Sequence, residues 1–253
     1  MNSVLRVALL ALVAFLNVGA APTVAQGTLT PDGGHLLGNP NAKVKLIAFE
    51  SYTCHFCAKF EQEGAPPLKL AYVQSGRVLL EVRHFVRDPV DLTAAMLSEC
   101  VAPSKFYAFH RSLFLNFDKW TALFGTVSKA QRDRWASTNR AAGRRAMASD
   151  FGFYAYAEAQ GLSRPMADKC LNDDKLAQRL AAQTKAYNDK VDLTGTPSFA
   201  INGAWLAATH DWASLAPQIE ARMQFQWRAV ERPKLCKSGP PPGLSLHSRC
   251  AMG

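Results

Sequence analysis

Two cysteines, Cys54 and Cys57, lie in the segment FESYTCHFCAKF with His55 and Phe56 between them. Such a pair could bind a metal, form a structural disulfide or exchange electrons with other thiols. A structural zinc site needs four ligands, and the sequence contains neither a second CxxC pair nor an HxxxH pair. A structural disulfide at this spacing closes a very small loop and constrains the unfolded chain least. The pattern favours a redox-active dithiol, and we expect no metal.

The predicted elements around Cys54 would make it the reactive cysteine. Residues 44–49 (VKLIAF) form a short apolar run bounded by turn residues, which predicts a buried strand, and helical character is predicted from Cys54 to Glu63. A cysteine at the start of a helix faces unpaired backbone N–H groups and the positive end of the helix dipole, which favour its thiolate. The thiolate is the attacking species in disulfide exchange. We therefore expect Cys54 to be accessible and ionised at neutral pH.

The neighbours of Cys54 are assigned supporting roles. Cys57, one helical turn further on and more buried, would attack Cys54 in a mixed disulfide. His55, when protonated, would stabilise the Cys54 thiolate through its N–H group or its charge. The alternative is a surface histidine without such a role, and the sequence leaves both interpretations open.

The elements that follow predict a sheet interrupted by a helical block. Gly64, Pro66 and Pro67 are expected to break or kink the first helix, and residues 78–86 (VLLEVRHFV) predict a second strand. Strand, helix and strand in this order begin a parallel or mixed sheet. Residues 91–190 lack strand-like alternation, and their helical spacing predicts four or five helices. The candidates are Asp91–Val101, Pro103–Phe117, Lys129–Arg140, Arg144–Gln160 and Asp173–Asp189, separated at Gly125, Gly143 and Gly161.

The helical block and the last strands complete an α/β fold class, a sheet domain with an inserted helical subdomain. The sheet resumes at Ser198–Ile201, where Asn202-Gly203 predicts a hairpin turn to a partner strand at Ala204–Ala207. An amphipathic helix follows at Asp211–Trp227, and the Pro-rich residues beyond Arg232 show no periodicity. Five aromatic side chains are expected to pack the core of the block: Phe106, Phe109, Phe114, Phe117 and Trp120.

The amino-terminal residues 1–25 have the pattern of a signal peptide. The apolar run VALLALVAFL at 7–16 follows Arg6 and is too short to cross a bilayer of about 30 Å as a helix. We expect cleavage after Ala25 and export to the periplasm, with an uncleaved anchor as the alternative. Disulfides persist in such a compartment. If Cys54 and Cys57 pair, the other four cysteines still allow three connectivities: Cys100, Cys170, Cys236 and Cys250.

The composition of the 253-residue chain is that of a globular protein, with 48% hydrophobic and 19% charged residues. The formal net charge is +9, but the Lys and Arg residues are scattered along the chain. The densest basic cluster, Arg140, Arg144 and Arg145, has Ala-rich helical neighbours and is interpreted as a solvated helix face. We therefore expect no nucleic-acid partner, whereas attraction to anionic membrane surfaces stays open.

The motif GNPNAKVKLIAFESYTCHFC, followed far downstream by TGTPSFAING, resembles the DsbA-like thiol-disulfide oxidoreductases of the bacterial envelope. The resemblance covers about residues 37–227 and implies a thioredoxin fold with a helical insertion. It implies that Pro197 is a cis-proline beside the dithiol and that Thr196 offers backbone hydrogen bonds to an extended substrate strand. It also implies a second, non-catalytic disulfide between Cys100 and Cys170, for which two buried free thiols are the alternative.

The chain then divides into five predicted parts. They are the signal peptide (1–25), the first part of the thioredoxin domain (26–90), the inserted helical subdomain (91–190), the second part of the thioredoxin domain (191–230) and a tail (231–253).

Three departures from the family pattern concern the tuning of the dithiol. The dipeptide His55-Phe56 stands where strongly oxidising members usually carry Pro-His, so the sequence leaves the redox potential open. Thr196 also precedes the proline in disulfide isomerases and reductases of the superfamily. Ala48 stands where many relatives place a buried carboxylate that relays protons to the second cysteine. Glu50, on the same strand face, either substitutes for that carboxylate or is an ordinary strand-end charge.

These features predict an exported dithiol oxidase that donates its disulfide to reduced, cysteine-containing proteins without a cofactor. Reoxidation would require a quinone-linked, DsbB-like membrane partner. The alternative is a disulfide isomerase or reductase kept in the dithiol form. Isomerases of the superfamily generally oligomerise, often through an amino-terminal module, and only about twenty residues precede the first predicted strand after cleavage, so we expect a monomer. A third hypothesis is a chaperone or binding module with an inert disulfide.

Overall fold

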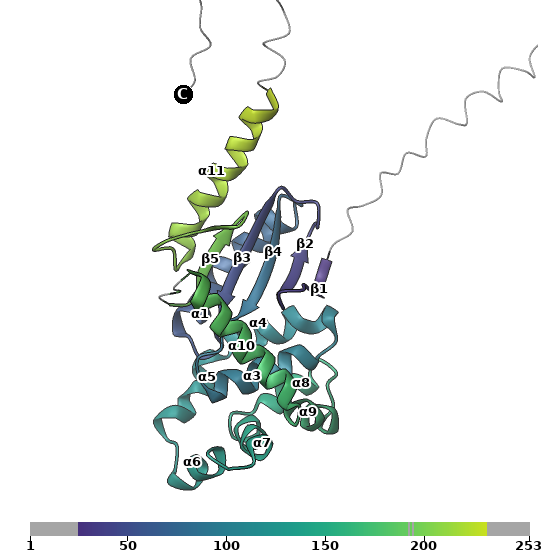
Figure 1. The fold of residues 1–253 in the computed structure, drawn as a ribbon, viewed down its shortest axis with the longest axis vertical. Coiled ribbons are helices and arrows are strands. Elements are labelled where there is room, and N and C mark those ends of the chain that lie inside the picture. The colour runs from purple at the N-terminus through teal and green to yellow at the C-terminus, as the bar shows by residue number, and fades with distance from the viewer. Residues whose placement is uncertain (1–24, 192, 194, 232–253) are drawn as a thin grey trace, which may run out of the picture.

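The computed structural model describes residues 25–191, 193 and 195–231 (Figure 1). The predicted signal peptide, up to residue 24, and the predicted tail from residue 232 on, with Cys236 and Cys250, lie outside the described residues. Within the described ranges, none of the helices combines the length and the apolar character that crossing a membrane requires. The boundaries assigned to the domains stay predictions.

A six-stranded mixed sheet forms the centre of the fold and confirms the predicted fold class. In the order β1-β2-β4-β3-β5-β6, only β3 and β4 are parallel neighbours within the described chain. The strands are β1 (Ala25–Leu29), β2 (His35–Gly38), β3 (Val44–Glu50), β4 (Val78–His84), β5 (Ser198–Ile201) and β6 (Ala204–Trp205). The last four match the predicted strands, with ends that differ by up to two residues.

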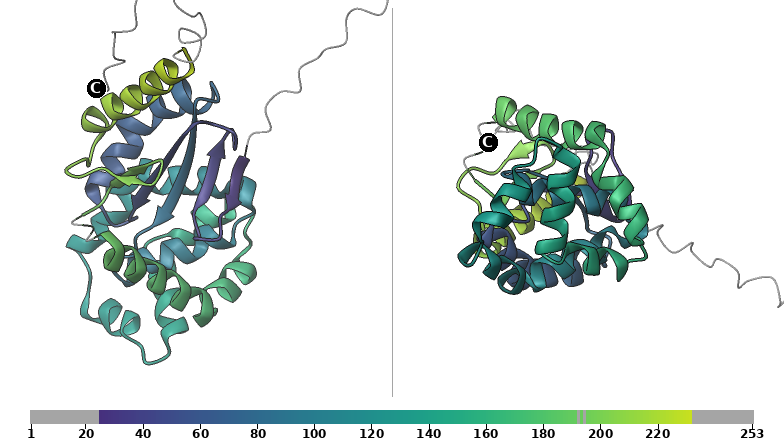
Figure 2. Two further views of the ribbon diagram at one scale, coloured as in Figure 1. Left: turned by 45° about the horizontal axis from the view of Figure 1, so that its top comes forward. Right: turned by 90° about the horizontal axis from the view of Figure 1, so that it is seen from below.

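One face of the sheet is covered by two helical segments that are far apart in the sequence (Figure 2). Val44, Leu46 and Ala48, every second residue of β3, are buried in this core, as expected for a strand whose alternate side chains share one face. The helix that begins at His55 and α11 (Trp212–Glu231) supply the facing apolar side chains. This packing fixes the end of β3 relative to the start of the first helix.

The first helix runs unbroken from His55 to Val73, so of the break or kink predicted at Gly64, Pro66 and Pro67 the break is wrong. Short α-helices alternate with π-helical turns as α1 (His55–Lys59), η1 (Phe60–Gly64), α2 (Ala65–Leu68) and η2 (Lys69–Val73). A proline inside a regular α-helix removes a backbone donor and clashes with the preceding turn. The wider turn before Pro66 relieves that clash, and the helix continues.

The chain between β4 and β5 is helical, as predicted, but it is divided more finely than four or five helices. The segments are α3 (Pro89–Cys100), η3 (Pro103–Lys105), α4 (Phe106–Leu115), α5 (Phe117–Thr121), η4 (Ala122–Gly125), α6 (Lys129–Trp135), α7 (Arg140–Asp150), α8 (Phe153–Glu158), α9 (Arg164–Leu171) and α10 (Asp174–Val191). The predicted helix Arg144–Gln160 is two helices, because Gly152 has a left-handed φ of 72° between them. In Figure 1, α5 to α9 lie beyond the end of the sheet where β3 and β4 finish.

Gly143 lies inside α7 and does not separate two helices, contrary to the prediction. A Cβ atom at this position would meet the carbonyl oxygen of Trp135 at 2.6 Å. The glycine therefore permits a close approach between α7 and the end of α6. The break falls before Arg140 instead, where Asn139 caps α7 by accepting a hydrogen bond from the N–H group of Ala142 (3.0 Å).

An amino-terminal hairpin, β1 and β2, was missed in the sequence analysis. Gly27 lies within β1, Gly38 ends β2 and Gly33 lies in the turn, and glycines are unfavourable in strands, so the segment has the pattern of a loop. The Tyr107 hydroxyl donates a hydrogen bond to the His35 carbonyl (2.7 Å) and ties the hairpin to α4. The hairpin occupies most of the residues that precede the first predicted strand, and the monomer stays a prediction.

The five aromatic residues predicted to form the core of the helical block are all buried. Four of them, Phe109, Phe114, Phe117 and Trp120, pack together with other residues of the block. Phe106 packs in the core of the sheet instead, where its ring stacks on His35 with the centroids 3.4 Å apart. Phe106 therefore joins the helical block to the sheet.

A disulfide joins Cys100, at the end of α3, to Cys170 in α9. The two cysteines are 70 residues apart in the sequence, and the segment between them contains α4 to α8. A crosslink across such a long segment removes much of the conformational freedom of the unfolded chain. The bond therefore holds the two ends of this segment together.

Replacing both Cys100 and Cys170 by alanine should lower the free energy of unfolding by about 2 to 4 kcal/mol, because the unfolded chain regains that freedom. Urea unfolding of the double variant and the unaltered protein measures the difference. The Cys54→Ala variant, which loses a thiol outside the segment, serves as the control. Equal midpoints for the double variant and the unaltered protein would contradict the assigned role.

Candidate active site

Cys54 lies at the start of α1, as the sequence analysis predicted. β3 ends at Glu50, and Cys54 has extended backbone angles (φ −95°, ψ 116°) immediately before His55. No side chain caps this helix start, so the backbone N–H groups of the first turn are available to the sulfur. A negative charge on the sulfur is stabilised at this position.

The loop between β3 and α1 is held by two aspartates at the start of α3. Asp91 accepts hydrogen bonds from the Ser51 hydroxyl (2.6 Å) and the Tyr52 N–H group (2.8 Å). Asp88 accepts one from the Thr53 hydroxyl (2.5 Å). The sequence analysis missed both, although an aspartate directly before a proline is a helix-start signal that points to Asp88. These bonds fix the backbone that carries Cys54.

The two halves of the sequence pattern meet in space, although 142 residues separate Cys54 from Thr196. The Thr196–Pro197 peptide bond is cis. The Cys54 thiol donates a hydrogen bond to the carbonyl oxygen of Thr196 at 3.0 Å, and the Pro197 carbonyl accepts one from His210 Nδ1 at 2.8 Å. The structure therefore brings Cys54, Cys57, Thr196 and Pro197 into one site.

The two sulfurs of the dithiol have opposite acid strengths. A hydrogen bond from Cys57 lowers the pKa of Cys54 to about 5 against the effect of burial, with further contributions from the Thr196 side chain and the backbone N–H groups of Cys57 and Phe56. Burial raises the pKa of Cys57 well above its ordinary value, and Cys54 and Glu50 raise it further. At neutral pH the dithiol therefore keeps a proton on Cys57 and a negative charge on Cys54, and the hydrogen bond that the Cys54 thiol donates to the Thr196 carbonyl belongs to the protonated form.

The expectation that Cys54 is accessible is wrong for the dithiol form seen here. Cys54 is 3% exposed and Cys57 is fully buried, because the Cys54 sulfur is turned toward the Thr196 carbonyl. Cys54 nevertheless lines an open hollow of about 420 Å³ together with Phe56, Arg87 and Thr196. Cys54 is therefore reached from outside through this hollow once its sulfur turns away from Thr196.

The dipeptide between the cysteines lies at the surface. Phe56 is 65% exposed at the edge of the hollow, and the ring of His55 lies 6.0 Å from that of Phe117. His55 is not among the main groups that lower the pKa of Cys54. Phe56 therefore provides an apolar contact surface beside the dithiol.

Glu50 is buried within a charged cluster near the dithiol. Its carboxylate oxygen Oε2 lies 3.5 Å from His110 Nε2, and the same nitrogen lies 3.7 Å from Glu61 Oε1. Lys69 Nζ lies 3.1 Å from Glu61 Oε2. Two carboxyl groups, an imidazole and an ammonium group thus offset one another where water is excluded.

The cluster shifts the acid strengths of its members. Burial raises the pKa of Glu50. Burial opposes the charged forms of Glu61 and His110 as well, but Lys69 and His110 hold the pKa of Glu61 at about 2, and the two carboxyl groups raise the pKa of His110 to about 9. Glu50 therefore lies in a region whose charge is set by several partners.

The sequence analysis missed Glu61 and His110. Glu61 lies four residues after Cys57, on the same face of the helix, and this spacing was a usable signal. His110 lies four residues after Phe106 and four before Phe114, so the apolar stripe conceals it.

Two groups in the described chain have the ligand types and spacing to hold a metal ion, and neither contains a cysteine. In one of them, His35 Nε2 lies 2.7 Å from Glu99 Oε1, and Arg179 donates to the other Glu99 oxygen. Beside each group a positively charged side chain already pairs with a carboxylate: Lys69 with Glu61 in one case and Arg179 with Glu99 in the other. The groups are Glu50, Glu61 and His110, and His35, His84 and Glu99.

Two of the other predicted cysteines, Cys100 and Cys170, are not at this site. Cys100 and Cys170 form their disulfide within the helical block, and Cys236 and Cys250 lie outside the described residues.

Comparison with known proteins gives the family. A family model described as thioredoxin matches residues 30–221. The chain belongs to the thioredoxin family. Within it, the solved structure of a protein-disulfide isomerase from Novosphingobium aromaticivorans is 45% identical, with a TM-score of 0.71 over 79% of this chain and 98% of that one. The solved alpha-DsbA1 of Wolbachia pipientis, 23% identical with a TM-score of 0.62 over 80% and 97%, shares the fold.

A Rickettsia typhi protein whose name includes the words protein-disulfide oxidoreductase is 30% identical over 169 residues. That alignment covers 66% of this chain and 54% of the relative, so the chain spans about half the length of the curated relatives it matches. The predicted family and thioredoxin fold are confirmed by these comparisons.

A titration of the reduced protein should show a thiolate that forms with a midpoint near pH 5, followed by its ultraviolet absorbance. Because the hydrogen bond from Cys57 is the largest cause of the low pKa, Cys57→Ala should move this midpoint upward. The double variant Cys100→Ala/Cys170→Ala should leave it in place. A midpoint at the ordinary value of a thiol in the unaltered protein would contradict the assigned environment of Cys54.

Proposed function

We propose that this chain is an exported thiol-disulfide oxidase that donates a Cys54–Cys57 disulfide to reduced, cysteine-containing proteins. The observation that carries the proposal is the ionisation and the position of the Cys54 sulfur. The pKa of Cys54 is lowered to about 5, and the sulfur lies 3.0 Å from the Thr196 carbonyl. A low pKa makes Cys54 a good leaving group, and a neighbouring backbone segment can pair with an extended peptide.

The reaction starts from the oxidised pair. A substrate thiolate attacks the Cys54 sulfur, the Cys54–Cys57 bond breaks, and its electron pair moves to Cys57, which takes up a proton because its pKa is high. A second substrate thiolate then attacks the substrate sulfur of the mixed disulfide, and Cys54 leaves as a stable thiolate. The substrate loses two electrons and gains a disulfide, and the protein retains the two electrons as a dithiol.

The surrounding residues are assigned supporting roles in this reaction. Burial and Cys54 are the main causes of the high pKa of Cys57, and Glu50, buried near it, raises that pKa further when ionised, so we assign to Glu50 the tuning role of the carboxylate that many relatives carry at the position of Ala48. Phe56 offers an exposed ring to apolar side chains of the substrate. Thr196 and Pro197 line the position of the substrate backbone.

Export and reoxidation complete the proposal. The apolar run at residues 7–16 supports a signal peptide, and a Cys100–Cys170 bond is of the kind that persists in the periplasm. Each reaction leaves the dithiol form, so a further partner must accept two electrons. A quinone-linked, DsbB-like membrane protein has the required chemistry.

Disulfide isomerisation is the second candidate function, because the relative that is 45% identical carries the description of a protein-disulfide isomerase. An isomerase acts from the dithiol form. The Cys54 thiolate would attack an incorrect disulfide and leave when the substrate rearranges, with no net transfer of electrons. The two candidates therefore differ in which redox form is active.

Oxidised protein should form disulfides in a reduced, unfolded substrate protein, and Cys54→Ala should abolish this reaction because no mixed disulfide can form. Recovery of the substrate's own activity measures it, and the Cys100→Ala/Cys170→Ala variant is the control with an intact dithiol. Undiminished oxidation by Cys54→Ala would contradict the proposal. Activity confined to reduced protein acting on a substrate with scrambled disulfides would favour the isomerase.

A further inference from the structure

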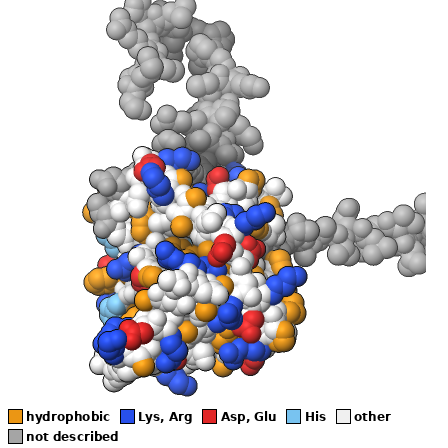
Figure 3. Space-filling view, turned by 60° about the horizontal axis from the view of Figure 1, so that its bottom comes forward, with side chains coloured by type: hydrophobic (Ala, Val, Ile, Leu, Met, Phe, Trp, Pro, Cys, Tyr) orange, Lys and Arg blue, Asp and Glu red, His pale blue; other side chains and the backbone are white. Residues whose placement is uncertain are grey.

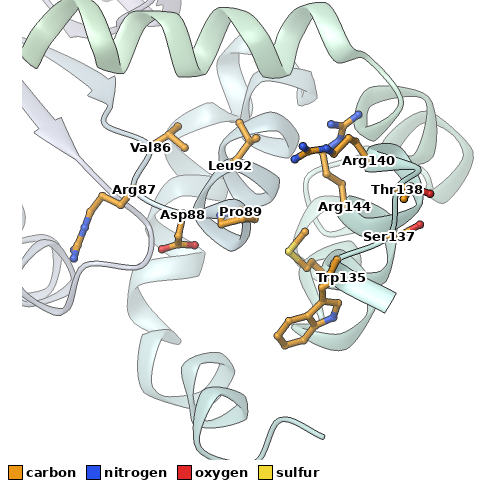
Figure 4. Close-up of a pocket in the computed structure, with 12 residues that line it drawn as sticks. Val86, Arg87, Asp88, Pro89, Leu92, Trp135, Ser137, Thr138, Arg140 and Arg144 are labelled. Carbon is orange, nitrogen blue, oxygen red and sulfur yellow. The ribbon is translucent and has the colours of Figure 1, made fainter. Parts of the chain in front are cut away.

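A second cavity, of about 660 Å³, opens beside the catalytic hollow, between the connection from β4 to α3 and the start of α7 (Figure 4). Its apolar lining includes Val86, Leu92, Trp135 and Met147. In the close-up, Arg140 and Arg144 face Leu92 from the opposite side. The cavity therefore has an apolar interior with guanidinium groups on one side.

The cavity lies next to the catalytic hollow. Arg87 lines both, and in Figure 4 its side chain points away from the cavity. Asp88, also in the cavity lining, accepts the hydrogen bond from Thr53, the residue before Cys54. One Cα step of 3.8 Å and the side chains of Thr53 and Asp88 separate Cys54 from Asp88, so the lining of the cavity begins roughly 10 Å from Cys54. An extended chain covers that distance in about three residues.

The charges around the cavity favour an anionic occupant. Arg144 is buried and fixed by the Leu171 carbonyl (2.7 Å) and by Asp174 (2.5 Å). Arg140 is exposed, and among the described residues no partner accepts a hydrogen bond or ion pair from its side chain. α7 begins at Arg140, so its positive end adds to the same field.

The single acidic side chain in the cavity lining keeps its negative charge, but its oxygens are already engaged in hydrogen bonds with groups outside the cavity. Asp88 Oδ2 accepts from Thr53, and Oδ1 accepts from the N–H groups of Val90 and Asp91 (both 2.9 Å). Asp88 is therefore not paired with Arg140, and the Arg140 guanidinium group is left to interact with a guest.

Basic side chains do not dominate every surface of the molecule. On the face shown in Figure 3, Lys and Arg side chains lie among Asp, Glu and apolar side chains and form no broad basic surface.

We propose that this cavity binds an acidic side chain of the substrate polypeptide, about three residues from the cysteine that reacts with Cys54. Glutamate fits because its methylene groups can lie on Leu92 and Val86 while its carboxylate reaches Arg140. This inference rests on the proposed function and adds a preference among substrates.

Two reduced peptides of equal length test the preference, each with one cysteine and either Glu or Lys three residues from it on both sides. Oxidised protein should react with the Glu peptide about fivefold faster at low salt, as one partly exposed ion pair permits. Arg140→Glu should remove or reverse the ratio. Arg132→Glu makes the same charge change on exposed α6, outside the cavity, and should leave the ratio unchanged.

Two results would overturn the inference. One is a Glu-to-Lys rate ratio in Arg140→Glu that equals the ratio in the unaltered protein. The other is an equal loss of that ratio in Arg140→Glu and Arg132→Glu. A cysteine-to-serine form of each peptide separates binding from reaction. The Glu form should shift the NMR signal of the Trp135 indole N–H group, which now donates to Asp150 at 2.7 Å, and the Lys form should not. If neither cysteine peptide reacts, the proposed function fails, while the Trp135 signal still decides whether the cavity binds the acidic peptide.

Discussion

The contact between the Cys54 sulfur and the Thr196 carbonyl is the interaction on which the site depends. It joins the start of α1 to the residue before the cis-proline. The contact is possible because β3 and β5 pair antiparallel, with Ala48 opposite Phe199, so the end of one strand lies beside the start of the other. Sheet pairing thus brings residues that are distant in the sequence to within hydrogen-bond reach. The backbone N–H groups at the start of α1 then help to stabilise the negative charge on Cys54.

The inserted helical block is part of this arrangement and not a separate addition. Its first helix provides Asp88 and Asp91, which hold the loop before Cys54, and α4 provides His110 in the charged cluster around Glu50. Phe106 and Tyr107 tie the block to the sheet and hairpin. Residues of the block therefore hold the loop that carries the dithiol, contribute His110 to the charged cluster around Glu50, and form part of the lining of the neighbouring cavity.

Sequence reasoning was strongest where a local pattern has one structural meaning. The apolar run ending at Phe49, the CHFC segment and the TGTPSFAING segment predicted a buried strand, a helix start and the partner loop, and the sheet and family were confirmed. It failed where tertiary packing decides. Glycines concealed the β1–β2 hairpin, π turns carried the first helix past Pro66, and close approach to Trp135 explains Gly143 inside a helix. Glu61 and His110 were missed because only the folded chain shows that they meet Glu50.

The reduction potential of the Cys54–Cys57 pair, measured in glutathione buffers, tests the central claim most directly. A thiolate favoured by its surroundings stabilises the reduced form and makes the disulfide oxidising. The account predicts a value between roughly −180 and −120 mV, in the range of protein disulfide isomerase and strong oxidants. A value near −270 mV, about that of thioredoxin, would mean that the environment of Cys54 does not favour disulfide donation, and would contradict the account.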